Sequence, residues 1–191
     1  MTKGRVEAFS DGVVAILITI MVLELKVPAG SSWDALREVT PTFLVYVLSY
    51  VFLGIYWNNH HHLFHAVHRV NGAMLWANLH LLFWLSLVPF VTKWMDESNF
   101  SSTPTAVYGG VLLCAGVAYL ILSKTIIRLE GPQSTLAKAV GRDVKGKLSA
   151  VLYGVAIPLA VVNRWISDAI YVTVALIWLS PDPRIESILR D

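Results

Sequence analysis

The stretch that decides the fold is RVEAFSDGVVAILITIMVLEL, residues 5–25 of a 191-residue chain. It is long enough to cross a bilayer, because about 20 residues at about 1.5 Å each cover a hydrocarbon core of about 30 Å. Yet it carries Asp11 near one end and Glu24 near the other. A charge inside a membrane span is costly and usually marks a functional position. We therefore expect a membrane helix that does more than anchor the chain.

The rest of the chain has the composition of a membrane protein. It is 55% hydrophobic and 15% charged with a mean hydropathy of +0.60, whereas soluble domains carry about 25% charged residues. This excludes an ordinary water-soluble domain. Stretches free of Asp, Glu, Lys and Arg predict an all-α polytopic membrane protein, a single domain over residues 1–191. Its six transmembrane helices are expected at 6–26, 41–64, 72–94, 105–127, 147–163 and a short 166–180, with a loop at 28–40.

The positive charges predict the orientation. With six spans, one side holds both termini and carries 11 of the 15 Lys and Arg residues. Cytoplasmic segments carry this excess, so both termini are predicted to be cytoplasmic in a cell membrane. The basic segment 124–147 on that side fits this bias and equally fits binding of anionic lipid headgroups. The other side holds Lys26, Arg37, Lys93 and Arg164.

Two motifs resemble those of a known family. The pattern R-x-x-x-F-S-D heads the first predicted span, and W-x-x-H-H lies on the second. Together they resemble the transmembrane protein 175 family, the endolysosomal potassium channels and their bacterial relatives. Bacterial members have six membrane helices per chain, so the likeness covers nearly the whole sequence. The residues that carry it are Arg5, Phe9, Ser10, Asp11, Trp57, His60 and His61.

The resemblance implies a channel rather than an enzyme. It implies a homotetramer in which the first helices line a central pore, with no cofactor apart from the permeant potassium ion. The expected partners are other copies of the chain, the lipid bilayer and potassium ions, without nucleic acid. The likeness to the bacterial members implies that the cell membrane is the bacterial inner membrane.

One face of the first predicted helix is a stripe of branched aliphatic side chains. At about 100° per residue, Ile16, Ile20 and Leu23 share this face, with Thr19 at its margin and Asp11 nearly opposite. Such a stripe ordinarily faces lipid or the protein core. The resemblance implies that it forms the pore constriction, with Ile16 as the main residue and Thr19 beside it. Because one stripe cannot enclose a pore, a symmetric ring of copies is required.

An all-hydrocarbon constriction predicts modest selectivity. The sequence has no T-V-G-Y-G loop whose carbonyls would replace the hydration shell of an ion. A ring of Ile or Leu offers no ligands and gates by dewetting. Potassium holds its water less tightly than sodium, so the expected function is a passive cation channel weakly selective for potassium. Glu24 is expected at the outer vestibule, or else paired with Lys26 or Arg37 of a neighbour.

Asp11 needs hydrogen-bond donors if it is buried. We expect Ser10 and Asp11 to lock the first helix against the second near the cytoplasmic end, with Trp57 and the histidines as donors. A structural ion pair between Arg5 and Asp11 is the other interpretation. A proton-coupled transporter that uses Asp11 remains an alternative function.

A cluster of histidines, His60–His68, suggests a second alternative, a membrane-embedded metal-dependent enzyme. His61, His65 and His68 are spaced i, i+4 and i+7, which places them on one helical face and is compatible with metal ligation. However, residues 39–69 contain no carboxylate that could act as a general base. Histidines at the cytoplasmic interface are the favoured interpretation.

Overall fold

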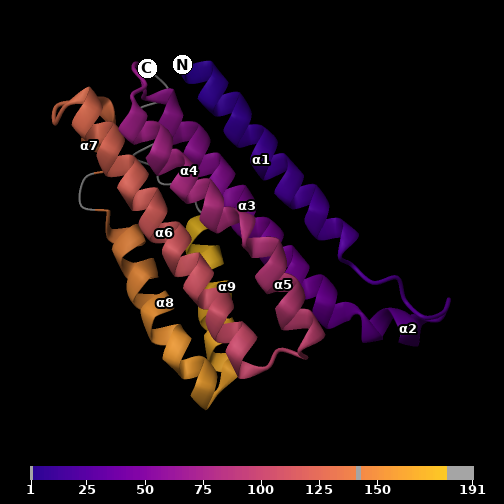
Figure 1. The fold of residues 1–191 in the computed structure, drawn as a ribbon. Coiled ribbons are helices and arrows are strands. Elements are labelled where there is room, and N and C mark those ends of the chain that lie inside the picture. The colour runs from indigo at the N-terminus through magenta and orange to yellow at the C-terminus, as the bar shows by residue number, and fades with distance from the viewer. Residues whose placement is uncertain (1, 141–142, 180–191) are drawn as a thin grey trace.

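The structure is a computed structural model, and it describes residues 2–140 and 143–179. Every regular element in those ranges is an α-helix, and the long helices run alongside one another in a bundle (Figure 1). The all-α fold expected from the sequence is confirmed. The helices are α1 (Lys3–Leu23), α2 (Trp33–Glu38), α3 (Thr40–His65), α4 (Gly72–Ser86), α5 (Val88–Glu97), α6 (Ser102–Glu130), α7 (Thr135–Val140), α8 (Val144–Val162) and α9 (Arg164–Leu179).

Five stretches of helix in the described residues are long and apolar enough to cross a membrane. They are α1, α3, α4 together with α5, α6, and α8. The remaining long helix, α9, has 16 residues and packs along α8, so it is the short last segment that the sequence predicted. A crossing this short needs a thin local bilayer or support from its neighbours.

The third segment is interrupted at Leu87, between α4 and α5. Pro89 causes the break, because proline has no amide hydrogen and its ring clashes with the carbonyl four residues earlier. The span predicted at 72–94 is confirmed as one apolar stretch, Gly72–Glu97, long enough to cross a membrane, but the break within it was not predicted. Other differences are smaller: α1 is shifted toward the N-terminus, and the loop predicted at 28–40 contains α2, whose first turn is capped by Ser32.

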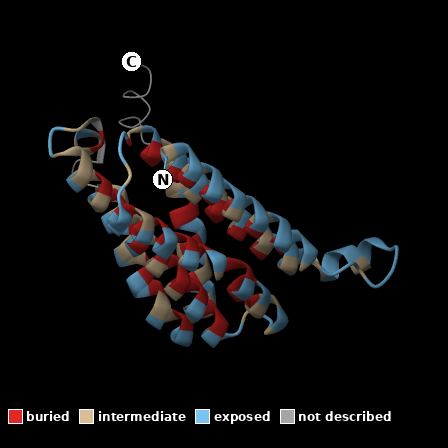
Figure 2. Cartoon of the chain, turned by 45° about the horizontal axis from the view of Figure 1, so that its top comes forward, coloured by how far each residue is buried: buried red, intermediate tan, exposed pale blue. Residues whose placement is uncertain are grey.

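The core is built around α6, which packs against α4, α5, α8 and α9. Its buried side chains include Tyr108, Leu112 and Leu122. A buried hydroxyl cluster adds to it, since Ser49 of α3 lies 2.7 Å from Thr92 of α5 and 3.0 Å from Tyr108. In contrast α1 lies at the edge of the bundle, where its outward side is exposed (Figures 1 and 2). It packs against α3, α4 and α5.

Gly109 allows α9 to approach α6 closely. A Cβ atom at this position would overlap with the hydroxyl of Tyr171 on α9. That hydroxyl donates a hydrogen bond of 3.0 Å to the carbonyl of Thr105, so it has no freedom to move away. At the neighbouring Gly110 a Cβ atom would meet nothing within 4 Å. Only the first of these two glycines is required for packing.

We therefore expect Gly109→Ala to lower the free energy of unfolding by about 1–3 kcal/mol, the usual cost of overpacking a core. The matched control is Gly110→Ala, which should leave stability unchanged or slightly raised, because alanine favours helix over glycine. The measurement is the thermal unfolding midpoint of each purified variant in detergent. Equal midpoints for the two variants would contradict the packing assigned to Gly109.

Candidate pore-lining helix and its polar lock

The aliphatic stripe predicted from the sequence lies on the exposed side of α1. Ile16 is 57% exposed and Leu23 is 81% exposed in the single chain, and Ile20 is exposed as well. Thr19 lies beside them, and its hydroxyl donates to the carbonyl of Ile16 at 2.9 Å. The hydroxyl oxygen therefore keeps lone pairs that can accept from water or contact a cation. The fold of one chain uses none of these side chains in its core.

The other side of α1 is buried against the bundle. It carries Val6, Ser10, Val14, Leu17 and Met21. Their spacing of three and four residues is that of a narrow helical face directed at the bundle. Four of the five are apolar, and the polar one, Ser10, is only 1% exposed. This face fixes the rotation of α1 and hence the direction of the exposed stripe.

A buried chain of hydrogen bonds joins Ser10 to two other helices. The amide of Asn78 on α4 donates to Ser10 Oγ at 2.9 Å, and Ser10 donates to the carbonyl of Val6 at 2.9 Å. His60 Nε2 on α3 lies 2.7 Å from Asn78 Oδ1. Asn78 and His60 are 2% and 5% exposed. Because the amide group donates to Ser10, its oxygen accepts, and the bonding pattern assigns the ring hydrogen of His60 to Nε2.

Asp11 lies on the surface, next to this buried chain. Its carboxylate accepts a hydrogen bond from Trp57 Nε1 on α3 at 2.9 Å. The Trp57 indole stacks on His61, with ring centroids 6.2 Å apart. A contact between the two motif residues and α3 was expected, but the buried member is Ser10 and the exposed one is Asp11.

Arg5 is exposed and forms no ion pair with any residue that the structure describes. The pair with Asp11 considered from the sequence does not form. Six residues separate the two, and at about 100° per residue they point in directions about 120° apart. The exposed Phe9 shares the outward side of the helix with Arg5.

Asn78 was missed by reasoning from the sequence. The signal was a carboxamide inside an otherwise apolar span, since such a side chain usually bonds to a neighbouring helix. His80, two residues further along the same helix, is exposed and accepts from Trp84 at 3.0 Å.

The sequence and the fold of this chain are similar to those of known proteins. The family model for the endosomal/lysosomal potassium channel TMEM175 matches residues 5–89. A potassium channel of Chryseobacterium sp. (strain P1-3) is 54% identical over 191 residues, which is 100% of both chains. The chain belongs to the TMEM175 family.

Two further TMEM175 relatives show how far the likeness extends. The crystal structure of a lysosomal potassium-selective channel TMEM175 homolog from Chamaesiphon minutus has a TM-score of 0.81 at 29% identity, covering 93% of this chain and 96% of that one. The endosomal/lysosomal proton channel TMEM175 of Gallus gallus is 35% identical over 109 residues, 51% of this chain and 22% of its own length. The family and these relatives are channels and not enzymes.

The histidines have structural contacts in this TMEM175-family chain. Glu130 at the end of α6 accepts from the backbone amides of His68 and Arg69 at 2.9 and 3.2 Å, and its second oxygen lies 3.1 Å from His68 Nδ1. His65 accepts from Lys3 through its carbonyl at 3.2 Å. Among the residues that the structure describes, no group of three or more His, Cys, Asp and Glu residues could hold a metal ion.

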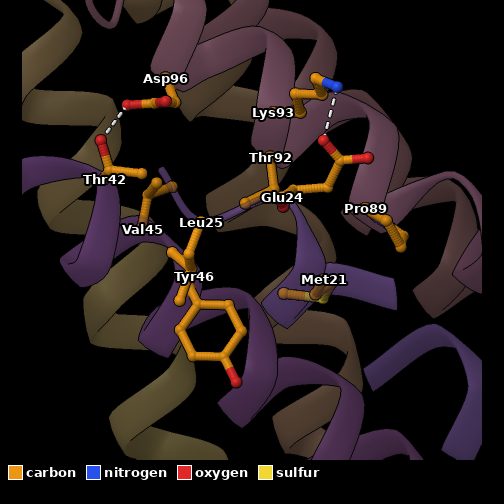
Figure 3. A pocket seen from close by; sticks show the side chains of 10 residues that line it. All are labelled: Met21, Glu24, Leu25, Thr42, Val45, Tyr46, Pro89, Thr92, Lys93 and Asp96. Atoms are coloured by element: carbon orange, nitrogen blue, oxygen red, sulfur yellow. Dashed lines mark hydrogen bonds and ion pairs between the residues drawn. The ribbon is translucent and has the colours of Figure 1, made fainter. Parts of the chain in front are cut away.

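The C-terminal end of α1 is held by charges from α5. Lys93 lies 2.5 Å from Glu24, and Asp96 accepts from Thr42 of α3 (Figure 3). Lys26 lies 3.7 Å from the other carboxylate oxygen of Asp96. Glu24, Lys93, Thr42 and Asp96 border a cavity of about 20 Å³, room for about one water molecule. Pairing of Glu24 with Lys26 or Arg37 of a neighbouring subunit stays a prediction, because the structure holds one chain. Within the chain its partner is Lys93, from a helix that had not been considered.

Removing the Ser10 hydroxyl is expected to weaken the attachment of α1. Ser10→Ala leaves the buried amide of Asn78 without its acceptor, at a cost of about 1–3 kcal/mol. The control is Ser86→Ala, because Ser86 is exposed and bonds only the carbonyl of Phe83 in its own helix. Thermal unfolding in detergent measures both. A loss for Ser10→Ala no larger than that for Ser86→Ala would show that the buried chain is not a lock.

Proposed function

We propose that this chain forms a passive potassium channel, weakly selective over sodium, in which the α1 helices of four copies line the pore. The observation that carries the proposal is the exposed aliphatic stripe of Ile16, Ile20 and Leu23 on an edge helix whose other side is fixed. Membership of the TMEM175 family supports it, and the names of the relatives support potassium as the permeant ion. Four-fold symmetry rests on the resemblance to the family.

In this proposal the constriction is a ring of hydrocarbon. Symmetry repeats Ile16 around the axis, and a narrow apolar ring empties of water unless an ion brings its own. An ion that crosses must shed or deform its hydration shell, and this costs less for potassium than for sodium. The hydroxyl ring of Thr19 would offer oxygen atoms next to the constriction. No dedicated carbonyl filter is required.

Three attachments of α1 support a constriction of fixed radius. Lys3 bonds the end of α3 at the inner end, Ser10 bonds Asn78 within the bundle, and Glu24 pairs with Lys93 at the outer end. They act on the back of the helix, so they would set the direction of the stripe without touching a permeating ion. Within the R-x-x-x-F-S-D motif this role is proposed for Ser10 and Asp11, together with Trp57, His60 and His61. Arg5 and Phe9 lie on the outward side of the helix and take no part in these attachments.

The chain would lie in the cell membrane with both termini in the cytoplasm, which places Glu24 at the outer mouth. A carboxylate repeated by symmetry would raise the local cation concentration there. Because Lys93 lies 2.5 Å from it, the net charge of each pair is close to zero. We therefore propose a weaker vestibule field than four free carboxylates would give.

The function is tested by potassium flux into liposomes that hold only this protein. With a protonophore present to remove any proton gradient, a channel still passes potassium down its own gradient and needs no substrate. A proton-coupled transporter that uses Asp11 would move protons together with potassium, so without the protonophore its flux would change the internal pH in proportion to the potassium moved, whereas a potassium channel would not. If no potassium flux is seen with or without a proton gradient, both the channel and the proton-coupled transporter are contradicted.

Ile16→Asn should reduce discrimination against sodium severalfold. The amide wets the ring and can ligate partly dehydrated ions of either kind. The matched control is Val22→Asn, because Val22 is also exposed on α1 but points about 120° away from Ile16. The measurement is the reversal potential in mixed potassium and sodium. An unchanged permeability ratio in a well-assembled Ile16→Asn channel would remove Ile16 from the constriction.

Two variants of Asp11 distinguish a structural role of this residue from a role of its charge in conduction. Asp11→Asn keeps an oxygen that accepts from Trp57, whereas Asp11→Ala does not. We expect the alanine variant to lower tetramer yield and the thermal unfolding midpoint, and the asparagine variant to behave like the wild type. Both should keep wild-type selectivity. If both variants assemble normally but change selectivity or pH response alike, the charge itself is used and the structural assignment is wrong.

A further inference from the structure

A large cavity lies away from α1, between α3 on one side and α6 and α8 on the other. Its volume is about 390 Å³, within the range of about 300–1,000 Å³ that small-molecule sites occupy. Neither the stripe of α1 nor the buried Ser10–Asn78–His60 chain contributes to its walls. The proposed ion path therefore leaves this cavity without a role.

The character of the walls changes from one end to the other. Near the middle of the helices the walls are apolar, with Phe52 of α3 and Leu113 and Val117 of α6. At the end where α6 finishes and α8 begins, the lining includes Lys124 and Lys147. This is the same end of the bundle as the N-terminus of α1, the side predicted to be cytoplasmic. A cavity that is apolar inside and basic at its mouth suits an amphipathic anion.

Most polar groups in the cavity walls form hydrogen bonds within the chain, whereas Lys124 and Lys147 form no ion pair with a described residue. Ser149 accepts from Trp178 Nε1 at 2.8 Å and donates to the carbonyl of Lys145 at 2.9 Å. Asp143, the one carboxylate at the mouth among the lining residues, accepts from the amide of Gly146 at 3.0 Å.

Lys124 and Lys147 are both exposed, and neither forms an ion pair with a residue in the described ranges. Two ammonium groups against one carboxylate leave the mouth positive.

We propose that this cavity binds an anionic phospholipid of the cytoplasmic leaflet. An acyl chain lies against the apolar walls contributed by α3 and α6, and the phosphate lies between Lys124 and Lys147. The membrane supplies this ligand at high concentration, and basic groups at its inner surface attract acidic headgroups. A free phosphate ion would use the lysines and leave the apolar walls uncovered, so the lipid fits the whole site and the ion fits only its mouth.

The test is native mass spectrometry of the delipidated protein in mild detergent, titrated with phosphatidylglycerol or phosphatidylcholine of the same acyl chains. We expect phosphatidylglycerol to bind more tightly. Each lysine near a headgroup contributes about fivefold in affinity, so Lys124→Gln with Lys147→Gln should weaken binding about 30-fold. The matched control removes two charges outside the cavity, Arg128→Gln with Lys138→Gln, and should bind like the wild type. Equal losses in both double variants, or equal affinity for the two lipids, would overturn the proposal.

Two further measurements separate the acyl chain from the headgroup. A Cβ atom at Gly116 would meet only the Tyr56 hydroxyl, at 3.7 Å, so Gly116→Leu fills the cavity from its wall without changing any charge. It should abolish phosphatidylglycerol binding, whereas Gly110→Leu, on the same helix outside the cavity, should not. Glycerol phosphate, the headgroup without chains, should fail to compete at lipid concentrations. Full competition by glycerol phosphate, or unchanged binding to Gly116→Leu, would show that no acyl chain enters and would contradict the site.

Discussion

The structure depends on one short chain of buried hydrogen bonds, in which Asn78 joins Ser10 to His60. Each of these groups would cost free energy if buried alone, and together they satisfy one another across α1, α4 and α3. Apolar packing alone would let α1 rotate or slide, because one branched aliphatic side chain replaces another at little cost. The hydrogen bonds form only at one distance and direction between the three side chains, so they fix one rotation of α1. They therefore determine which side of α1 faces the bundle and which side is left exposed.

The helices α6 and α1 differ in how much of their surface is packed within the chain. The interior is organised around α6, whose buried residues pack against four other helices. In α1 only a narrow face packs, and most of the remaining surface is apolar and exposed. A helix with such a surface is either bathed in lipid or covered by another subunit. The symmetric assembly that we propose covers it and places the same surface around an axis.

Sequence reasoning succeeded where periodicity and composition carry the information. Charge-free stretches located the long helices, and the spacing of Ile16, Ile20 and Leu23 placed them together on one face. It failed where a contact depends on how helices dock. Lys93 as the partner of Glu24 follows from the approach of α5 to α1, and no local pattern encodes that approach. The burial of Ser10 in place of Asp11 is a rotation of about 100°, a single residue along the helix, which only packing decides.

The hydrocarbon face of α1 also bears on how such a channel is made. A subunit whose pore side is polar cannot rest alone in a bilayer, because lipid would leave its polar groups without partners. Here the exposed side chains of the stripe are as soluble in lipid as the tails themselves. A newly inserted chain can therefore fold completely and diffuse in the plane of the membrane before the proposed assembly, without a chaperone to cover this face. The surface proposed to hold back ions is thus also the one that makes the solitary subunit a stable intermediate of biogenesis.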